Sequence, residues 1–293
     1  MLHLIDVSHI IHPMYHGFPK MVRPTDGHPV GAVHGVCYSF WRLALEQPSH
    51  VAVVYDAPGG SKARKAKFPD YKATRKPYPE DLAKQLPLVR RAADIFDFAR
   101  VEVEGYESDD VIATYCRLAA ARGLEVTIVS SDKDCAQLVR WDDGQAPAVS
   151  MRDPKKEITY NPDGVREKHG VPPHQIADFL ALMGDVSDNI PGVDKIGEKT
   201  AAALLTQFGS LEAILDRVDE VSKPNIQMSL RQHGWKGRLS KTLTVLDDHV
   251  PVEHDIEEFA YGGFDKDKVL EFLDEMQLVT LRADIEKGER VAA

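Results

Sequence analysis

The stretch VTIVSSDKD (residues 126–134) places two carboxylates, Asp132 and Asp134, directly after a short apolar run rich in β-branched residues. Three further runs have the same form: LHLID (2–6), VAVVYD (51–56) and RVEVEGYESDD (100–110). Apolar runs of this length, separated by helical stretches, are typical of buried parallel strands. We therefore expect an α/β fold with a twisted, mostly parallel sheet flanked by helices.

The acids that follow these runs are expected to gather at one edge of the sheet, because ligands of open α/β sheets bind beyond the carboxyl ends of the strands. The segment GDVSDNIPG (184–192) adds two more acids. The nine candidate metal ligands are Asp6, Asp56, Glu107, Asp109, Asp110, Asp132, Asp134, Asp185 and Asp188. Two like charges about 4 Å apart repel by roughly 4 kcal/mol at an effective dielectric of about 20. Such a cluster needs cations, and hard oxygen ligands suit the Mg²⁺ or Mn²⁺ pairs that cut phosphodiesters.

Each group of acids also has a structural interpretation. Capping a helix would need only one acid, whereas GYESDD (105–110) has three in four positions. A turn explains one aspartate after a strand, but Asp132 and Asp134 would point the same way in an extended chain, with Lys133 pointing away. The acids that end the first two runs are, taken singly, explained equally well as turn residues.

The histidines do not form a ligand set of the HExxH type. Four of them lie close to Asp6 in the sequence, and we interpret them as packing or surface residues: His3, His9, His12 and His16.

Length and composition indicate a globular protein with one large or two modest domains. The chain has 293 residues, of which 43% are hydrophobic and 28% charged. No apolar run approaches the roughly 20 residues that span a bilayer, and the N-terminus has no secretory signal. Three cysteines without metal-type spacing fit a reducing compartment. We expect a cytoplasmic monomer with no membrane partner.

The charge is unevenly distributed. The net charge is −10, yet residues 62–76 carry seven basic residues against one acid. Residues 223–241 carry five basic residues and no acid. One such run is ordinarily a solvated face, but two runs beside an acidic cluster indicate a track for phosphates. From the first run we expect nucleic-acid contacts by Lys62, Lys65, Lys67, Tyr71, Arg75 and Lys76. Its aromatic residues either stack on bases or pack the loop against the body, and both interpretations stay open.

The segment GDVSDNIPGVDKIGEKTAAALL (184–205) indicates a helix–hairpin–helix element that binds the backbone of a nucleic acid. Its glycines allow close backbone approach, and the helix that opens after them can face a phosphate with its N–H groups. The candidate contacts are Gly192, Lys195, Gly197, Lys199 and Thr200. We expect a catalytic domain at 1–165, with a basic arch loop at about 60–80, and a helical DNA-binding domain at 166–293.

Three segments, GYESDD, SSDKD and GDVSDNIPGVDKIGEKTA, resemble those of the structure-specific 5′ nucleases. This flap endonuclease/5′–3′ exonuclease family includes the 5′-nuclease domain of bacterial DNA polymerase I. The resemblance covers roughly residues 2–255. It implies a PIN-like domain, a helix–hairpin–helix domain that often binds K⁺, and two-metal hydrolysis.

The resemblance also implies roles for individual residues. It places Asp6, Asp56, Glu107, Asp109 and Asp110 around the first metal, and the other four acids around the second. FPDYKATR (68–75) resembles the arch of the family, which makes Lys72 and Arg64 phosphate-contacting residues. With Asp6, Asp56 and Asp132, they complete the expected catalytic set.

The sequence departs from the family pattern in three places. Val7 replaces the usual Gly after the first Asp, and Pro13 stands where the family has Arg. Lys195 replaces a hairpin Gly. We expect Lys20 or Arg23 to contact the scissile phosphate instead.

The function predicted from the sequence is metal-dependent 5′–3′ exonuclease and flap endonuclease activity on DNA, in replication or repair, by a free-standing nuclease. A DNA-junction-binding protein without catalysis is one alternative. A nuclease that acts mainly on RNA primers in RNA–DNA hybrids is another.

Overall fold

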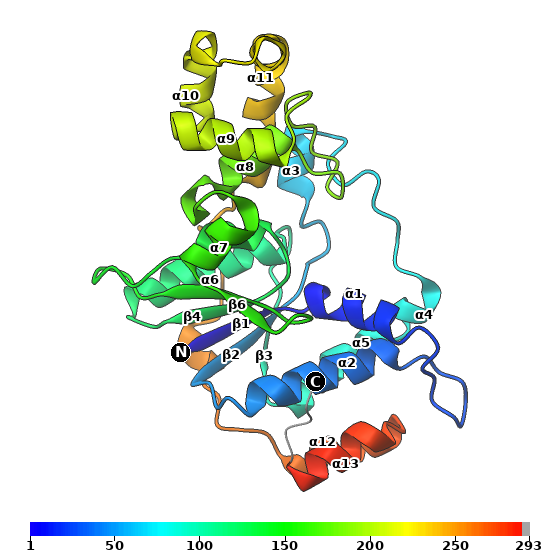
Figure 1. Cartoon of the computed structure of the whole chain (residues 1–293). Coiled ribbons are helices and arrows are strands. Elements are labelled where there is room, and N and C mark those ends of the chain that lie inside the picture. The colour runs from blue at the N-terminus through cyan, green and yellow to red at the C-terminus, as the bar shows by residue number, and fades with distance from the viewer. Residues whose placement is uncertain (289–293) are drawn as a thin grey trace.

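The computed structural model describes residues 1–288 and is built on one six-stranded sheet in the order β3-β2-β1-β4-β5-β6 (Figure 1). The strands are β1 Leu2–Asp6, β2 His50–Val54, β3 Ala99–Val101, β4 Val126–Val129, β5 Val149–Asp153 and β6 Ile158–Tyr160. Neighbouring strands run parallel from β3 to β5, and β6 pairs antiparallel with β5. The prediction of a mostly parallel sheet flanked by helices is confirmed.

The two faces of the sheet pack against two separate apolar cores. Leu2 and Leu4 of β1 pack in a core that includes α6, Ser108–Ala121. Ile5 of the same strand packs in a second core, with α2, Gly31–Ala44. Successive side chains of a strand point to opposite faces, which explains this division. The sheet is covered on both sides, and its central strands β1, β2 and β4 are accordingly almost entirely buried.

Helix α1, Ser8–Gly17, was not predicted, because its segment contains Pro13 and several histidines. A proline inside a helix removes one backbone hydrogen bond and lowers helix stability. Here Ile10 and Ile11 are buried in the core beside α2. The helix therefore depends on tertiary packing, which a local pattern does not reveal.

The helical segment that precedes β3 is divided in two. Helix α4 covers Glu80–Ala83 and α5 covers Leu86–Ile95. Pro87 lies in the first turn of α5, where its missing N–H costs least. Buried Gln85 at the junction accepts a hydrogen bond of 2.8 Å from the N–H of Ala32, which ties the break to the start of α2.

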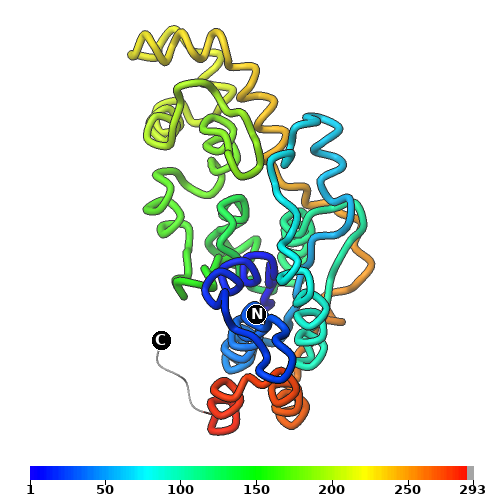
Figure 2. The backbone as a smooth tube through the Cα atoms, turned by 90° about the vertical axis from the view of Figure 1, so that its right-hand side faces the viewer, coloured from blue at the N-terminus to red at the C-terminus, as the bar shows by residue number. Residues whose placement is uncertain are grey.

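The second half of the chain forms a helical unit that shares the apolar core on the α6 face of the sheet and lies at one end of an elongated molecule (Figure 2). Its helices are α7 Pro162–His169, α8 Ile176–Met183, α9 Glu198–Phe208, α10 Leu211–Asp216 and α11 Pro224–Thr244. Helix α3, Lys62–Lys67, from the basic run of the first half, lies against α11. The two basic segments therefore meet in space.

The last two helices do not pack within this helical unit. Helices α12, Lys266–Glu275, and α13, Val279–Lys287, lie at the opposite end of the molecule (Figure 1). Phe272 and Leu281 are buried in the core that contains α2 and α5. We expected one helical domain over residues 166–293. Helices α12 and α13 instead pack with α2 and α5 of the sheet domain. No helix among the residues described is both long enough and apolar enough to span a bilayer.

Candidate metal centre and nucleic-acid interface

A cavity of about 550 Å³ opens at the carboxyl edge of the parallel strands. Five of the nine acids predicted as ligands line it: Asp6, Asp56, Glu107, Asp109 and Asp132. Asp6 ends β1 and Asp56 follows β2, Glu107 and Asp109 lie at the start of α6, and Asp132 follows β4. The other four acids are not among the lining residues: Asp110, Asp134, Asp185 and Asp188. All of these except Asp134 form an ion pair with a basic side chain.

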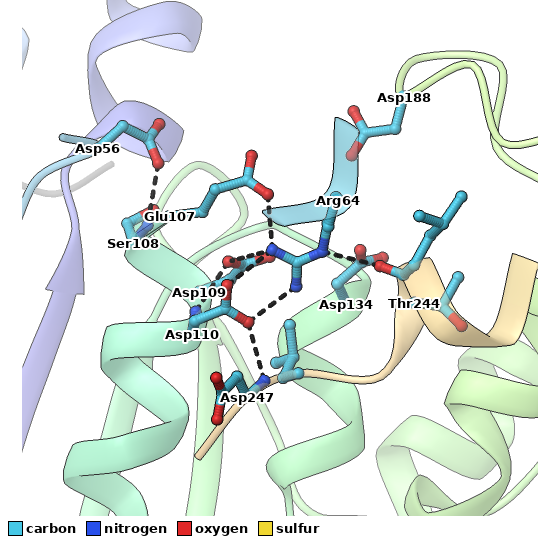
Figure 3. Close-up of polar contacts among 12 residues, drawn as sticks. Asp56, Arg64, Glu107, Ser108, Asp109, Asp110, Asp134, Asp188, Thr244 and Asp247 are labelled. Atoms are coloured by element: carbon cyan, nitrogen blue, oxygen red, sulfur yellow. Dashed lines mark hydrogen bonds and ion pairs between the residues drawn. The ribbon is translucent and has the colours of Figure 1, made fainter. Parts of the chain in front are cut away.

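The first two strands present one buried and one exposed carboxylate. Asp6 is only 1% exposed, and burial raises its pKa to about 6. Ser130 Oγ donates a hydrogen bond of 3.1 Å to Asp6 Oδ2. Asp56 is exposed and accepts a hydrogen bond of 3.0 Å from the backbone N–H of Ser108 at the start of α6 (Figure 3). The helix start therefore orients Asp56 toward the cavity.

Arg64 lies in the middle of the acids that open α6 (Figure 3). Its guanidinium is 2.6 Å from Glu107 and forms a two-point contact of 2.6 and 2.8 Å with Asp110. Its Nε donates to the carbonyl of Leu243 at 2.9 Å. Arg64 is 7% exposed and does not line the cavity. The structure thus buries Arg64 as a counter-charge instead of presenting it to a phosphate.

Two further acids are buried at this edge. Burial raises the pKa of Asp109 well above its usual range, and Asp110 and Glu107 add to the rise, although Arg64 opposes it. Burial likewise raises the pKa of Asp134, with Asp132 and Asp109 as the next causes. Buried carboxylates held this close together are stabilised by an additional positive charge.

The arch segment supplies the basic side chains nearest the cavity. Lys72 lines the cavity, and its Nζ contacts Glu107 and lies 3.8 Å from Asp188. Arg75, with half of its side chain exposed, pairs with Asp188 at 2.6 Å. Tyr71 is 2% exposed, and its hydroxyl donates to Glu107 at 3.1 Å. Of the two interpretations left open for the aromatic residues, the structure shows packing for Tyr71.

The chain after β4 differs from the extended geometry expected for SSDKD. Lys133 has helical dihedrals, and Asp134 begins a 3₁₀ turn that runs to Leu138. Lys133 does not point away from the acids, because its Nζ lies 2.7 Å from Asp185. This pair joins the strand edge to the loop after α8. The tight turn follows from local hydrogen bonds, such as the one of 3.0 Å from Asp134 N–H to Asp132 Oδ1.

His9 lies among the acids, although the sequence analysis interpreted it as a packing or surface residue. Its Nε2 is 3.7 Å from Asp6 Oδ2 and 3.4 Å from Asp132 Oδ2. Burial lowers the pKa of His9, but the two carboxylates outweigh burial and raise it to about 9. Burial alone would raise the pKa of Asp132, yet the contact with His9 holds it at about 2. The signal that could have identified His9 is its position three residues after Asp6, at the point where the chain turns from β1 into α1.

His12, interpreted in the same way, also lines the cavity, and its ring lies 5.2 Å from that of Tyr78. Lys20 and Arg23, expected to contact the scissile phosphate, do not line it. Arg23 instead forms an ion pair of 2.6 Å with Asp26.

Most of the remaining basic residues predicted to contact nucleic acid are exposed. Lys62, Lys65 and Lys76 are open to solvent, and Lys76 also lines the cavity. Lys67 is exposed, and its Nζ donates to the carbonyl of Thr242 in α11 at 3.3 Å. The basic run therefore leads from the helical unit to the rim of the acidic cavity.

The loop between α8 and α9 has the shape of the predicted hairpin. Gly192 is buried with φ +61°, and a Cβ there would lie 2.4 Å from the backbone nitrogen of Gly184. Lys195 has φ +62°, a conformation that glycine adopts at lower cost. Gly197 immediately precedes α9, and Lys199 and Thr200 lie in its first turn, with Lys199 exposed.

The donor atoms fit one or more divalent cations. Two groups of three residues each have ligand atoms within 4.8 Å of one another. One group is Glu107, Asp109 and Asp110, which offer carboxylate oxygens. The other is Asp6, His9 and Asp132, which offer two carboxylate oxygens and one imidazole nitrogen. Carboxylates suit Mg²⁺ and Mn²⁺, and buried acids with raised pKa values fit a site that a cation completes.

Comparisons with known proteins match both the sheet domain and the helical unit. Residues 1–170 match a family model described as 5′-3′ exonuclease, N-terminal resolvase-like domain, and residues 171–267 match 5′-3′ exonuclease, C-terminal SAM fold. DNA polymerase I of Rhizobium leguminosarum is 38% identical over 288 residues, which are 96% of this chain and 28% of that protein. DNA polymerase I of Bacillus caldotenax is 39% identical over 278 residues, 93% of this chain and 31% of that protein. The chain thus spans less than a third of these relatives.

A solved structure with the same fold is that of the bacteriophage T5 D15 flap endonuclease in a pseudo-enzyme-product complex with DNA and metal ions. It superposes with a TM-score of 0.68 at 20% identity, and the match covers 98% of both chains. At this identity the likeness shows the fold alone.

Proposed function

Because this chain belongs to the 5′-3′ exonuclease family, we propose that it is a metal-dependent, structure-specific 5′ nuclease that hydrolyses DNA phosphodiesters at or near 5′ ends and branch points. The observation that carries the proposal is the cavity at the sheet edge, where five carboxylates and Lys72 converge. An acidic cavity lined by a lysine suits a phosphodiester that metal ions bring to it.

The acids would hold the metal. Asp6, Asp56, Glu107, Asp109 and Asp132 offer oxygens directly to the cavity. Mg²⁺ or Mn²⁺ bound there would lower the pKa of an attacking water and stabilise the leaving oxygen. Asp134, Asp185 and Asp188 do not line the cavity, and we assign them to contacts through water or to orientation of the lining acids.

The basic residues divide into two roles. Lys72 would stabilise negative charge on the phosphate, because it lines the cavity and its Nζ contacts Glu107, another lining residue. Arg64 would act as a positioning residue that fixes Glu107 and the start of α6, because its contacts leave it no access to substrate. This assignment replaces the direct phosphate contact that the family resemblance implied for Arg64.

The helical unit would bind duplex DNA by its backbone. The hairpin before α9 offers N–H groups at the helix start and the exposed side chain of Lys199. We propose K⁺ as an ion of this hairpin and a boundary between the two domains near residue 165. The contacts of the hairpin with the DNA backbone involve phosphates and do not distinguish one base from another. Exposed Lys62, Lys65 and Lys76 would lead a single strand toward the cavity.

Cleavage of an end-labelled 5′-flap duplex tests this function. The whole chain is incubated with Mg²⁺, with Mn²⁺ and with EDTA, beside the Asp109→Asn variant as a site control. Metal-dependent cuts near the flap junction support the proposal. Binding of the flap without cutting in any metal would instead favour a junction-binding protein, and preferential cutting of an RNA–DNA hybrid would assign the enzyme to RNA primers.

A further inference from the structure

We propose that His9 is itself a metal ligand, so that Asp6, His9 and Asp132 form a mixed nitrogen and oxygen site within the cavity. The inference rests on the proposed function and adds to it the class of metal. One imidazole among carboxylates would favour Mn²⁺ and other transition metals over Mg²⁺. The site lies between acids that the family resemblance assigned to two different metals.

The distances from His9 to the two carboxylates are close to those between ligands around one ion. Metal bonds of about 2.1 Å place neighbouring ligand atoms roughly 3.0 Å apart in octahedral geometry and roughly 3.4 Å apart in tetrahedral geometry. His9 Nε2 lies 3.4 Å from Asp132 Oδ2 and 3.7 Å from Asp6 Oδ2. All three donor atoms lie within 4.8 Å of one another. His9 Nε2 is therefore already at about ligand spacing from both carboxylates.

The other ring nitrogen of His9 is held as in metal-binding histidines. Nδ1 lies 3.0 Å from Ser131 Oγ, which leaves Nε2 directed at the two carboxylates. A hydrogen bond at the second nitrogen fixes the orientation and tautomer of a ligating histidine. His9 also lies in the first turn of α1, which Ile10 and Ile11 anchor in the core. The ring is therefore placed by packing before any metal arrives.

The two carboxylates are held as firmly. Asp6 is the last residue of β1, and Ser130 Oγ donates to its Oδ2 at 3.1 Å. The same Ser130 Oγ accepts from the N–H of Asp132 at 3.0 Å. One serine therefore links the carboxylate of Asp6 to the backbone of Asp132, which connects the end of β1 to the segment after β4.

A different role for His9 gives the opposite result on substitution. If His9 served only as a positive charge that neutralises Asp6 and Asp132, it would compete with a cation for them. Removing it would then strengthen metal binding, because two acids would be freed. If His9 is a ligand, removing it weakens binding by about tenfold or more, as loss of groups at metal sites generally does. A rise in metal affinity on substitution of His9 would therefore indicate a neutralising charge, and a fall would indicate a ligand.

Binding of Mn²⁺ to the whole chain, followed by calorimetry and by pulsed electron paramagnetic resonance, tests the inference. We expect a nitrogen-14 coupling to bound Mn²⁺ in the wild type that is lost in His9→Gln. His12→Gln, which changes another histidine of the same cavity, is the matched control and should keep the coupling. We also expect His9→Asp, which makes the three donors all oxygen, to narrow the ratio of Mn²⁺ to Mg²⁺ affinity by about tenfold.

The outcomes distinguish this inference from the proposed function. Bound Mn²⁺ without nitrogen coupling, or tighter binding by His9→Gln, would overturn the ligand role of His9 while metal-dependent flap cleavage still stood. Loss of the coupling in His12→Gln alone would assign the nitrogen to His12 and also overturn it. Absence of any Mn²⁺ binding would overturn both. Far-ultraviolet circular dichroism of each variant shows whether the fold is retained.

Discussion

Replacing Arg64 by methionine is expected to destabilise the folded protein strongly. The substitution retains most of the apolar stem but removes the contacts of 2.6 Å to Glu107 and of 2.6 and 2.8 Å to Asp110. Both acids are at most 7% exposed as side chains, so neither can recover hydration in the native state. Breaking a buried ion pair from one side costs about 3–5 kcal/mol. In a chain of this size, that corresponds to a fall in melting temperature of roughly 5–15 °C.

The matched control is Arg75→Met. Arg75 also pairs with a carboxylate at 2.6 Å, Asp188, but half of its side chain is exposed. Solvent screens such a pair, so its loss should cost at most about 1 kcal/mol. Urea unfolding followed by circular dichroism in EDTA measures both free energies of unfolding.

A double variant shows whether the unpaired acid is the cause. Arg64→Met combined with Asp110→Asn should be more stable than Arg64→Met alone, because one of the uncompensated charges is removed. Saturating Mg²⁺ should also recover part of the loss by binding near Glu107. The reasoning is refuted if Arg64→Met and Arg75→Met lose the same free energy, or if the double variant is the less stable of the two.

Three further outcomes are expected. Asp132→Asn should lower the cleavage rate of a 5′ flap by at least about 100-fold, because it removes a metal ligand, while DNA affinity in EDTA stays within about threefold of the wild type. Single-turnover kinetics measure the cleavage rate, and fluorescence anisotropy measures the DNA affinity. Lys72→Ala should reduce the single-turnover rate more than the affinity, because its Nζ lines the cavity, and equal losses would indicate a docking role. Gly192→Ala should cost several kcal/mol of unfolding free energy, because its Cβ would meet the nitrogen of Gly184 at 2.4 Å. Gly197→Ala, with open space around its Cβ, should cost less than about 1 kcal/mol, and similar urea midpoints for the two would contradict the close packing.

The mismatch between the predicted and observed role of Arg64 has a physical origin. A basic residue in a basic run has the same local pattern whether it faces phosphate or acids. Only the packing of α3 against α11, with the start of α6 nearby, turns Arg64 inward. The choice between stacking on bases and packing, which the sequence left open for Tyr71, is decided in the same way: Tyr71 is buried and donates to Glu107.

The sequence by itself determined the parallel sheet, the helical second half and the gathering of acids at one edge. Apolar runs specify buried strands, and the parallel arrangement brings their ends together whatever the loops do. The hairpin before α9 was likewise readable, because positive φ angles and close backbone approach require glycine at positions such as Gly192.

Only the tertiary structure decided which side chains share the cavity. Helix α1 forms because Ile10 and Ile11 are buried, and this helix carries His9 to Asp132, more than a hundred residues away in the chain. The return of α12 and α13 to the sheet layer also depends on apolar surface that α2 and α5 leave to be covered. Contacts between distant segments depend on how whole helices and strands pack, and a local sequence pattern does not indicate which other element a helix or strand will pack against.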